Sequence, residues 1–82
     1  MNEKSLTLYK TAEGETVQVS SLQLAGSMRR RLQDIGLTIG TSVRCLQKSP
    51  SGDPVAYLIR GAVIALRSED SSRIIVSASD AG

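Results

Sequence analysis

Residues 28–40 read MRRRLQDIGLTIG, and this stretch decides how the chain folds, because it alone has the apolar spacing of a helix. Met28, Leu32 and Ile35 stand at positions i, i+4 and i+7, so a helix places all three on one face. An apolar stripe of this kind needs a core to pack against. We therefore expect these three residues to be structural contacts between a helix and the rest of the domain.

Neighbouring residues indicate where this helix begins and ends. Ser27 is suited to be the N-cap, since its hydroxyl can accept a hydrogen bond from a free amide of the first turn. Gly36 is suited to the position just after the helix, where a left-handed backbone favours glycine, and Gly40 is a second break. The prediction is a helix of about two and a half turns around residues 27–35. A helix this short is marginal alone, so other elements must hold it.

The rest of the chain has the pattern of short β-strands. Apolar residues between turn-forming residues predict five strands, at residues 16–20, 41–48, 55–60, 62–66 and 74–76. Gly61 permits a sharp break between the third and the fourth of them, and residues 68–72 fit one helical turn or a polar loop. Five short strands with close turns favour an all-β fold, a small and strongly bent β-barrel. The alternative is an open two-layer α+β sheet, which one short helix would leave largely uncovered.

Length and composition are those of one globular domain. The chain has 82 residues, of which 40% are hydrophobic and 22% charged. We assign residues 6–77 to a single domain, residues 1–5 to a flexible N-terminus and residues 78–82 to a C-terminal tail. The core has to be largely aliphatic, because Tyr9 and Tyr57 are the only aromatic residues.

Charge, cysteine content and hydropathy indicate a cellular location. The formal net charge of +2 is too small to predict nucleic acid as a partner by itself. A single cysteine, Cys45, excludes an internal disulfide and fits a reducing compartment. No apolar run approaches the roughly 20 residues needed to cross a bilayer, and the first residues lead into no signal-peptide core. We expect a cytoplasmic protein that does not itself insert into a membrane.

The side chains offer little material for metal binding or catalysis. The chain has no histidine, its one cysteine fits a buried strand position, and its acidic pairs, Glu13 with Glu15 and Glu69 with Asp70, are typical of solvated turns. The serines lack a histidine that could act as their base. We therefore predict no catalytic residue, no metal ligand and no cofactor.

Two surface features remain as candidates for partner contact. Arg29 and Arg30 follow each other in the predicted helix and offer a basic patch to an acidic partner. The loop residues Gly52, Asp53 and Pro54 form a turn-rich segment without the Lys-Ser/Thr ending of a phosphate-binding loop. We predict that both features contact a protein. Nucleic acid is disfavoured, since no aromatic platform or second basic cluster supports it.

One predicted strand is apolar on both of its faces. In residues 55–59, either Ala56 and Leu58 or Val55 and Tyr57 must point away from the core. That outward face needs either cover by another element of the chain or a partner. Tyr57 and Leu58 are therefore the remaining predicted partner contacts. Recognition of proline-rich peptides is disfavoured, because its groove requires several aromatic side chains.

A series of short motifs resembles the FeoA family in order and spacing, from about residue 14 to residue 76. These motifs are Arg31–Leu32, Gly36–Leu37, Gly40, Pro50–Ser51–Gly52–Asp53–Pro54, Gly61 and Leu66–Arg67. The chain departs from the family at two positions. Ile39 stands where the family often has proline, and Ala62 stands where a larger side chain is common. Neither difference disrupts a helix or a strand, and both are expected to alter the surface that contacts a partner.

The resemblance implies an SH3-like domain and a function. FeoA proteins are small bacterial accessory proteins that accompany the ferrous iron transporter FeoB, a membrane protein with a guanine-nucleotide-binding domain. The resemblance thus implies a non-enzymatic cytoplasmic protein that is peripheral to the inner membrane and regulates a FeoB-type transporter through protein contacts. Self-association stays open. The alternatives are a metal-responsive regulatory domain, like the SH3-like domains that end some metal-dependent repressors, and a small RNA-associated barrel.

Overall fold

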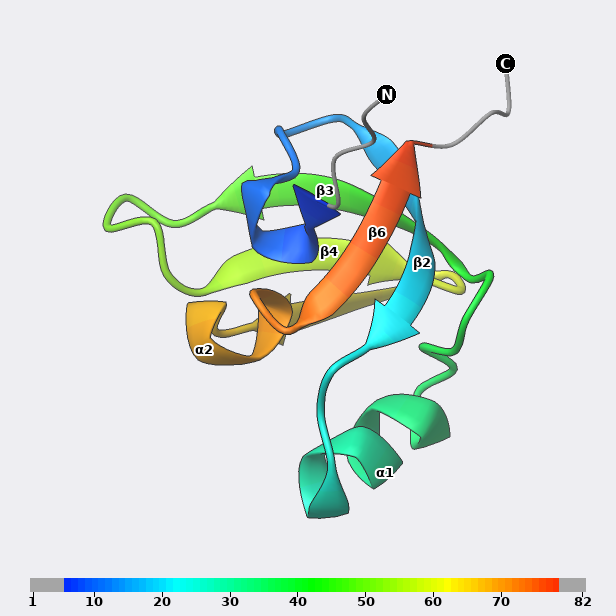
Figure 1. Ribbon diagram of the computed structural model, residues 1–82. Coiled ribbons are helices and arrows are strands. Elements are labelled where there is room, and N and C mark those ends of the chain that lie inside the picture. The colour runs from blue at the N-terminus through cyan, green and yellow to red at the C-terminus, as the bar shows by residue number, and fades with distance from the viewer. Residues whose placement is uncertain (1–5, 79–82) are drawn as a thin grey trace.

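Six antiparallel strands form one sheet in the computed structural model, which describes residues 6–78 (Figure 1). The strands lie in the order β1-β6-β2-β3-β4-β5, so β1 and β5 are the two edges. In chain order the elements are β1 (Leu6–Thr7), the 3-10 turn η1 (Leu8–Lys10), β2 (Thr16–Leu22), α1 (Gly26–Asp34), β3 (Ser42–Lys48), β4 (Val55–Ile59), β5 (Ala62–Leu66), α2 (Ser68–Ser71) and β6 (Ile74–Ala78).

The sequence-based fold class is confirmed, with small changes in the number and length of the elements. The five predicted strands are β2 to β6, and the helical turn predicted at residues 68–72 is α2. A two-residue strand, β1, adds a sixth by pairing Leu6 with Val76. Strand β6 runs to Ala78, which pairs with Val17, so this strand is two residues longer than predicted. The predicted flexible N-terminus and the remainder of the tail lie outside the described residues.

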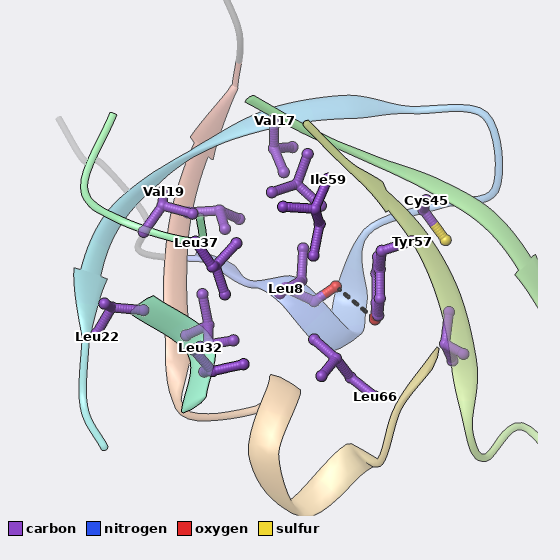
Figure 2. Packing of buried hydrophobic residues seen from close by; sticks show 14 of the residues in the cluster. Leu8, Val17, Val19, Leu22, Leu32, Leu37, Cys45, Tyr57, Ile59 and Leu66 are labelled. Atoms are coloured by element: carbon purple, nitrogen blue, oxygen red, sulfur yellow. Dashed lines mark hydrogen bonds between the residues drawn. The ribbon is translucent and has the colours of Figure 1, made fainter. Parts of the chain in front are cut away.

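The sheet curls around a single core (Figure 2), and in β2 and β4 every second side chain points into that core. Register irregularities in β2 and in β3 help the strands bend at these places. The core is aliphatic apart from one tyrosine and one cysteine, and it consists of Leu8, Val17, Val19, Leu22, Leu24, Leu32, Leu37, Val43, Cys45, Val55, Tyr57, Ile59, Leu66, Ile74 and Val76. The prediction that Cys45 is a buried small hydrophobe is confirmed, since its side chain is fully buried.

Helix α1 lies across one end of this core and is held there by its apolar stripe (Figure 1). Leu32 is its only buried residue, and Met28 and Ile35 pack against the core from partly buried positions. The predicted N-cap is wrong. The chain enters α1 directly after the buried Leu24, so Ala25 takes the cap position and Ser27 lies inside the first turn, too late to cap it.

The C-terminal end of α1 has the expected glycine. Gly36 has φ +93°, its N–H donates to the carbonyl of Gln33 at 3.0 Å, and the N–H of Leu37 donates to the carbonyl of Leu32 at 2.9 Å. These two bonds together are the Schellman arrangement, which satisfies carbonyls left over at a helix end. The helix therefore stops where the sequence predicted, because only glycine adopts this backbone conformation at low cost.

Candidate partner-binding surfaces

A groove separates α1 from the edge strand β5 and from α2. It has a volume of about 380 Å³ and is lined by Met28, Arg31, Leu32, Ile35, Ile64, Ala65, Leu66, Arg67, Glu69 and Asp70. The apolar members are mostly buried or half-buried, whereas three of the four charged members are exposed. The groove therefore has an apolar floor and a charged rim, and it borders β5, which among the described strands has a partner on one side only.

A second hollow of about 580 Å³ lies on the outer face of the sheet, beside the turn that joins β4 to β5. Arg44 and Arg60 line it together with Leu58, and the described part of the chain contributes no acidic side chain to the lining. The turn itself consists of Arg60 and Gly61, which both have positive φ, at 50° and 84°. That is the geometry of the type I′ turn, the tight connection whose twist suits a two-residue hairpin.

Arg29, a predicted partner contact, is already engaged within the domain. One of its guanidinium nitrogens, Nη1, lies 3.2 Å from the carbonyl oxygen of Leu22 and 3.4 Å from that of Leu24. These bonds tie α1 to the segment that follows β2. Arg30, by contrast, is exposed to solvent and remains available, so its contact with a partner stays a prediction.

The predicted contact loop between β3 and β4 is braced from several sides. The Ser49 hydroxyl donates to the carbonyl of Pro54 at 2.8 Å, and the Tyr9 hydroxyl donates to the carbonyl of Gly52 at 3.2 Å. The carboxylate of Asp53 accepts hydrogen bonds from the backbone N–H of Ser68 at 2.8 Å and from its hydroxyl at 3.1 Å. Asp53 therefore caps the N-terminal turn of α2, and its contact with a partner stays a prediction.

Tyr57 cannot be the surface contact that we predicted, because its side chain is fully buried (Figure 2). Its hydroxyl lies 3.4 Å from the carbonyl oxygen of Leu8. The sequence left open which face of this strand points to the core. In the structure Val55 and Tyr57 point inward, and Ala56 and Leu58 are half-buried on the outer face. Leu58 lines the second hollow, and its contact with a partner stays a prediction.

Burial of Tyr57 has a measurable consequence. Desolvation raises the pKa of this phenol from its ordinary value of 10.0 to about 12. We expect a Tyr9→Phe variant, in which Tyr57 is the only tyrosine, to form phenolate with a midpoint near about 12 in an absorbance titration. Between these two pKa values the unfolded chain releases the proton and the folded chain keeps it, so stability should fall as the pH rises through this window. Urea melts at about pH 9 and about pH 11 measure the loss.

A Tyr57→Phe variant is the control, since it should lack the contribution of this group to the pH dependence. A phenolate midpoint near the ordinary value of 10.0 in the folded Tyr9→Phe protein would contradict the buried position of the hydroxyl.

The acidic residues and the cysteine that the sequence singled out are dispersed. Within residues 6–78, no three His, Cys, Asp or Glu side chains gather where they could jointly hold a metal ion. The Glu13 carboxylate accepts a hydrogen bond from the N–H of Lys48 at 2.7 Å, and the Glu15 carboxylate accepts one from Ala12 at 3.0 Å. Burial raises the pKa of the Cys45 thiol, which disfavours the nucleophilic thiolate.

The predicted contact residues do not form one site. The β3–β4 loop projects at the left of Figure 1, whereas α1 with its arginines lies at the bottom. The two hollows were missed by sequence reasoning. Their linings come from elements far apart in the chain, and the one available signal was the apolar outer face of residues 55–59, which borders the second hollow.

This bent antiparallel sheet with one core and a short helix across its end is the architecture of small SH3-like barrel domains. The sequence model of the FeoA domain matches residues 6–78, and the chain belongs to the FeoA family. The family links the chain to ferrous iron transport and to a role as an accessory protein.

A search of curated proteins found no match. Among residues 6–78, no helix is long and apolar enough to span a bilayer.

Solved structures agree with this assignment. The FeoA protein of Chlorobium tepidum superposes with a TM-score of 0.87 at 27% identity, covering 94% of this chain and 73% of that one. FeoA of Stenotrophomonas maltophilia, an SH3 domain protein solved with zinc, gives a TM-score of 0.77 at 28% identity, with coverage of 88% and 89%. A manganese-dependent transcriptional repressor shares the fold, with a TM-score of 0.83 at 22% identity over 96% of this chain and 39% of the repressor.

Proposed function

We propose that this chain is a non-enzymatic accessory protein of ferrous iron transport that binds the cytoplasmic side of a FeoB-type transporter and regulates it. Membership of the FeoA family supports this function. So does the similarity to the Stenotrophomonas maltophilia protein, which has been considered a ferrous iron transport activating factor. On this proposal the chain is cytoplasmic and reaches the inner membrane only through its partner.

The groove between α1 and β5 is the observation that carries the proposal. Strand β5 has the sequence AVIAL, which is wholly apolar and uncharged, and within residues 6–78 it pairs only with β4. No other strand of the described chain pairs with its second edge, and Ile64, in the middle of β5, is only partly buried. An extended segment of the transporter can pair with this edge and place apolar side chains on the floor formed with α1. An exposed apolar edge of this kind can pair with other chains and cause aggregation. A bound partner segment would cover this edge.

The charged residues at the rim of the groove can set the direction in which a partner segment binds. Arg31 on α1 and Arg67 after β5 are basic, and Glu69 and Asp70 on α2 are acidic. A bound segment with a complementary order of charges would dock in one direction, because opposite charges attract and like charges repel across the same groove.

Calorimetric titration of the chain against the cytoplasmic part of a FeoB-type transporter tests the proposal, first with GDP and then with a GTP analogue. We expect saturable binding whose affinity differs between the two nucleotides, because an accessory protein that regulates the transporter must distinguish its states. Absence of binding in both nucleotide states, to the cytoplasmic part and to the full transporter in lipid nanodiscs, would contradict it.

Two arginine variants on one helix tell which surface binds. Arg31 lines the groove, whereas Arg30 is its exposed neighbour and is not part of the groove lining. We expect Arg31→Glu to weaken binding about tenfold and Arg30→Glu to change it by less than about twofold. The reverse result would assign binding to the outer face of α1, as predicted from the sequence, and would exclude the groove.

A metal-responsive regulatory domain is the second candidate, and the fold shared with the manganese-dependent repressor favours it. Titration of the isolated chain with ferrous iron under anaerobic conditions separates the two functions. Tight binding of one iron per chain would support the regulatory domain, and binding of the transporter by the metal-free chain would support the accessory protein.

A further inference from the structure

The hollow on the outer face of the sheet places two arginines beside an apolar strip. Cross-strand pairing sets Thr16 opposite Arg44, Arg44 opposite Leu58, and Leu58 opposite Val63. These four residues therefore form one row across β2, β3, β4 and β5, and directly paired side chains lie on the same face of a sheet. Arg44 is exposed, and Val63 at the end of the row is 65% exposed. The row thus offers a positive charge at its centre and an apolar surface at one end.

Arg60 reaches the same hollow from the β4–β5 turn and is held by the end of α1. Its Nε donates to the carbonyl oxygen of Gly36 at 2.9 Å, and the Thr41 hydroxyl donates to the same oxygen at 3.1 Å. Thr41 is 6% exposed, and its hydroxyl also accepts from the N–H of Thr38 at 3.1 Å. The wall of the hollow is therefore braced by bonds between three segments, so its arginine needs little ordering when a ligand arrives.

The charges in this hollow are not compensated by its own lining. Arg44 and Arg60 are part of the lining, and among residues 6–78 none of the other lining residues is acidic. Within the described residues, the hydrogen bond of Arg60 uses its Nε, which leaves its two terminal nitrogens as further donors. Two guanidinium groups with free donors match the planar oxygens of a carboxylate, which accepts paired N–H bonds.

We propose that this outer-face hollow binds a carboxylate side chain, flanked by aliphatic residues, of the protein partner, with Arg44 and Arg60 as the ligands. This inference rests on the proposed function in naming the transporter as the source of the segment. A carboxylate next to aliphatic side chains fits better than a polynucleotide. Leu58 lines the hollow with the arginines and is paired with Val63, and nucleic acid binding draws on a larger number of phosphate contacts than two arginines make.

Amide chemical shifts of the labelled full chain give a direct test with the capped peptide Ac-Ser-Val-Glu-Val-Ser-NH2. We expect this peptide to shift the amides of Gly40, Ser42, Arg44 and Gly61, which line the hollow. Its glutamine counterpart should give shifts at least about threefold smaller at equal concentration, because the amide offers no charge to the guanidinium groups. Equal shifts from both peptides would overturn the inference.

The Arg44→Gln variant asks whether the shifts depend on this arginine, and Arg73→Gln is its control, since Arg73 is exposed and does not line the hollow. The peptide shifts should fall at least about threefold in the first variant and persist in the second. Persistence in both would overturn the site. Inorganic phosphate is the third probe. If it shifts the same amides at lower concentration than the glutamate peptide, the site is one for phosphate and the inference is wrong.

The same variants separate this inference from the proposed function. If the transporter binds the wild-type chain and Arg44→Gln equally well, the hollow is not the contact, although the accessory function stands. If the transporter does not bind and the glutamate peptide does, the carboxylate site is supported and the transporter is excluded as its source.

Discussion

The Leu32→Ala variant is expected to lower the free energy of unfolding by about 2–5 kcal/mol. Leu32 is 1% exposed and is the only buried residue of α1, so the substitution removes the one side chain that the helix places fully inside the core. Truncation leaves a cavity between α1 and the sheet as well as removing favourable burial. Domains of this size have total stabilities of only about 5–15 kcal/mol, so the effect is a large share of the whole.

Urea denaturation measures this loss as a lower midpoint at an unchanged slope. Arg30→Ala is the matched control on the same helix, and since Arg30 is exposed it should change the free energy of unfolding by no more than about 0.5 kcal/mol. Equal midpoints for Leu32→Ala and the wild type would mean that α1 is held by contacts other than its apolar stripe.

The Gly36→Ala variant is expected to lower the free energy of unfolding by about 2–4 kcal/mol. Gly36 has φ +93°, a conformation that strains any residue with a Cβ. A Cβ at this position would also lie 2.8 Å from Nε of Arg60, and still nearer to the adjacent methylene. The alanine therefore displaces the guanidinium that donates to the Gly36 carbonyl, at the end of α1 where a positive charge is favourable.

Gly40 supplies the matched control, because it has the same φ of +93° and nothing within 4 Å of an added Cβ. Gly40→Ala should show the backbone strain alone, about 1–2 kcal/mol. In an Arg60→Ala background, Gly36→Ala should then cost no more than Gly40→Ala, since the clash and the hydrogen bond are both gone. Equal costs for the two alanines in the wild-type background would show that Arg60 does not stabilise the end of α1.

These two positions bear on binding as well as on stability. Helix α1 forms one wall of the groove beside β5, and the Gly36 carbonyl also holds Arg60 in the outer-face hollow. Both candidate surfaces thus depend on the same short helix end. Loss of Leu32 should loosen the first surface, and displacement of Arg60 should change the second.

Prediction from the sequence succeeded where the determinants are local. The spacing of Met28, Leu32 and Ile35 is a property of eight consecutive residues, and Gly36 ends the helix through its own backbone freedom. The strand pattern likewise follows from alternation along each segment. The N-cap at Ser27 failed for a tertiary reason, because the buried Leu24 and the two bonds of Arg29 go with a cap two residues earlier, at Ala25.

Prediction of the contact residues reached its limit at the strand of residues 55–59. Because side chains alternate along a strand, Tyr57 and Leu58 must lie on opposite faces of the sheet. The sequence does not tell which of the two faces the core, since both faces are apolar. The pairing of β4 with β3 and β5 makes that choice, and it buries Tyr57. A one-residue change of register would have reversed every side chain of the strand.

Local sequence patterns were enough to predict the fold class, the position and length of the short helix and the aliphatic core, and they show that no histidine is present for metal or acid–base chemistry. Which surfaces are free follows from long-range packing. Arg29 donates a hydrogen bond to the carbonyl of Leu22 within the domain, and Asp53 accepts one from Ser68 of α2, 15 residues away. Arg44 and Arg60 line the same hollow. The physical reason is that periodicity and turn chemistry act over a few neighbouring residues, whereas a binding surface is formed by long-range pairing that brings distant side chains together.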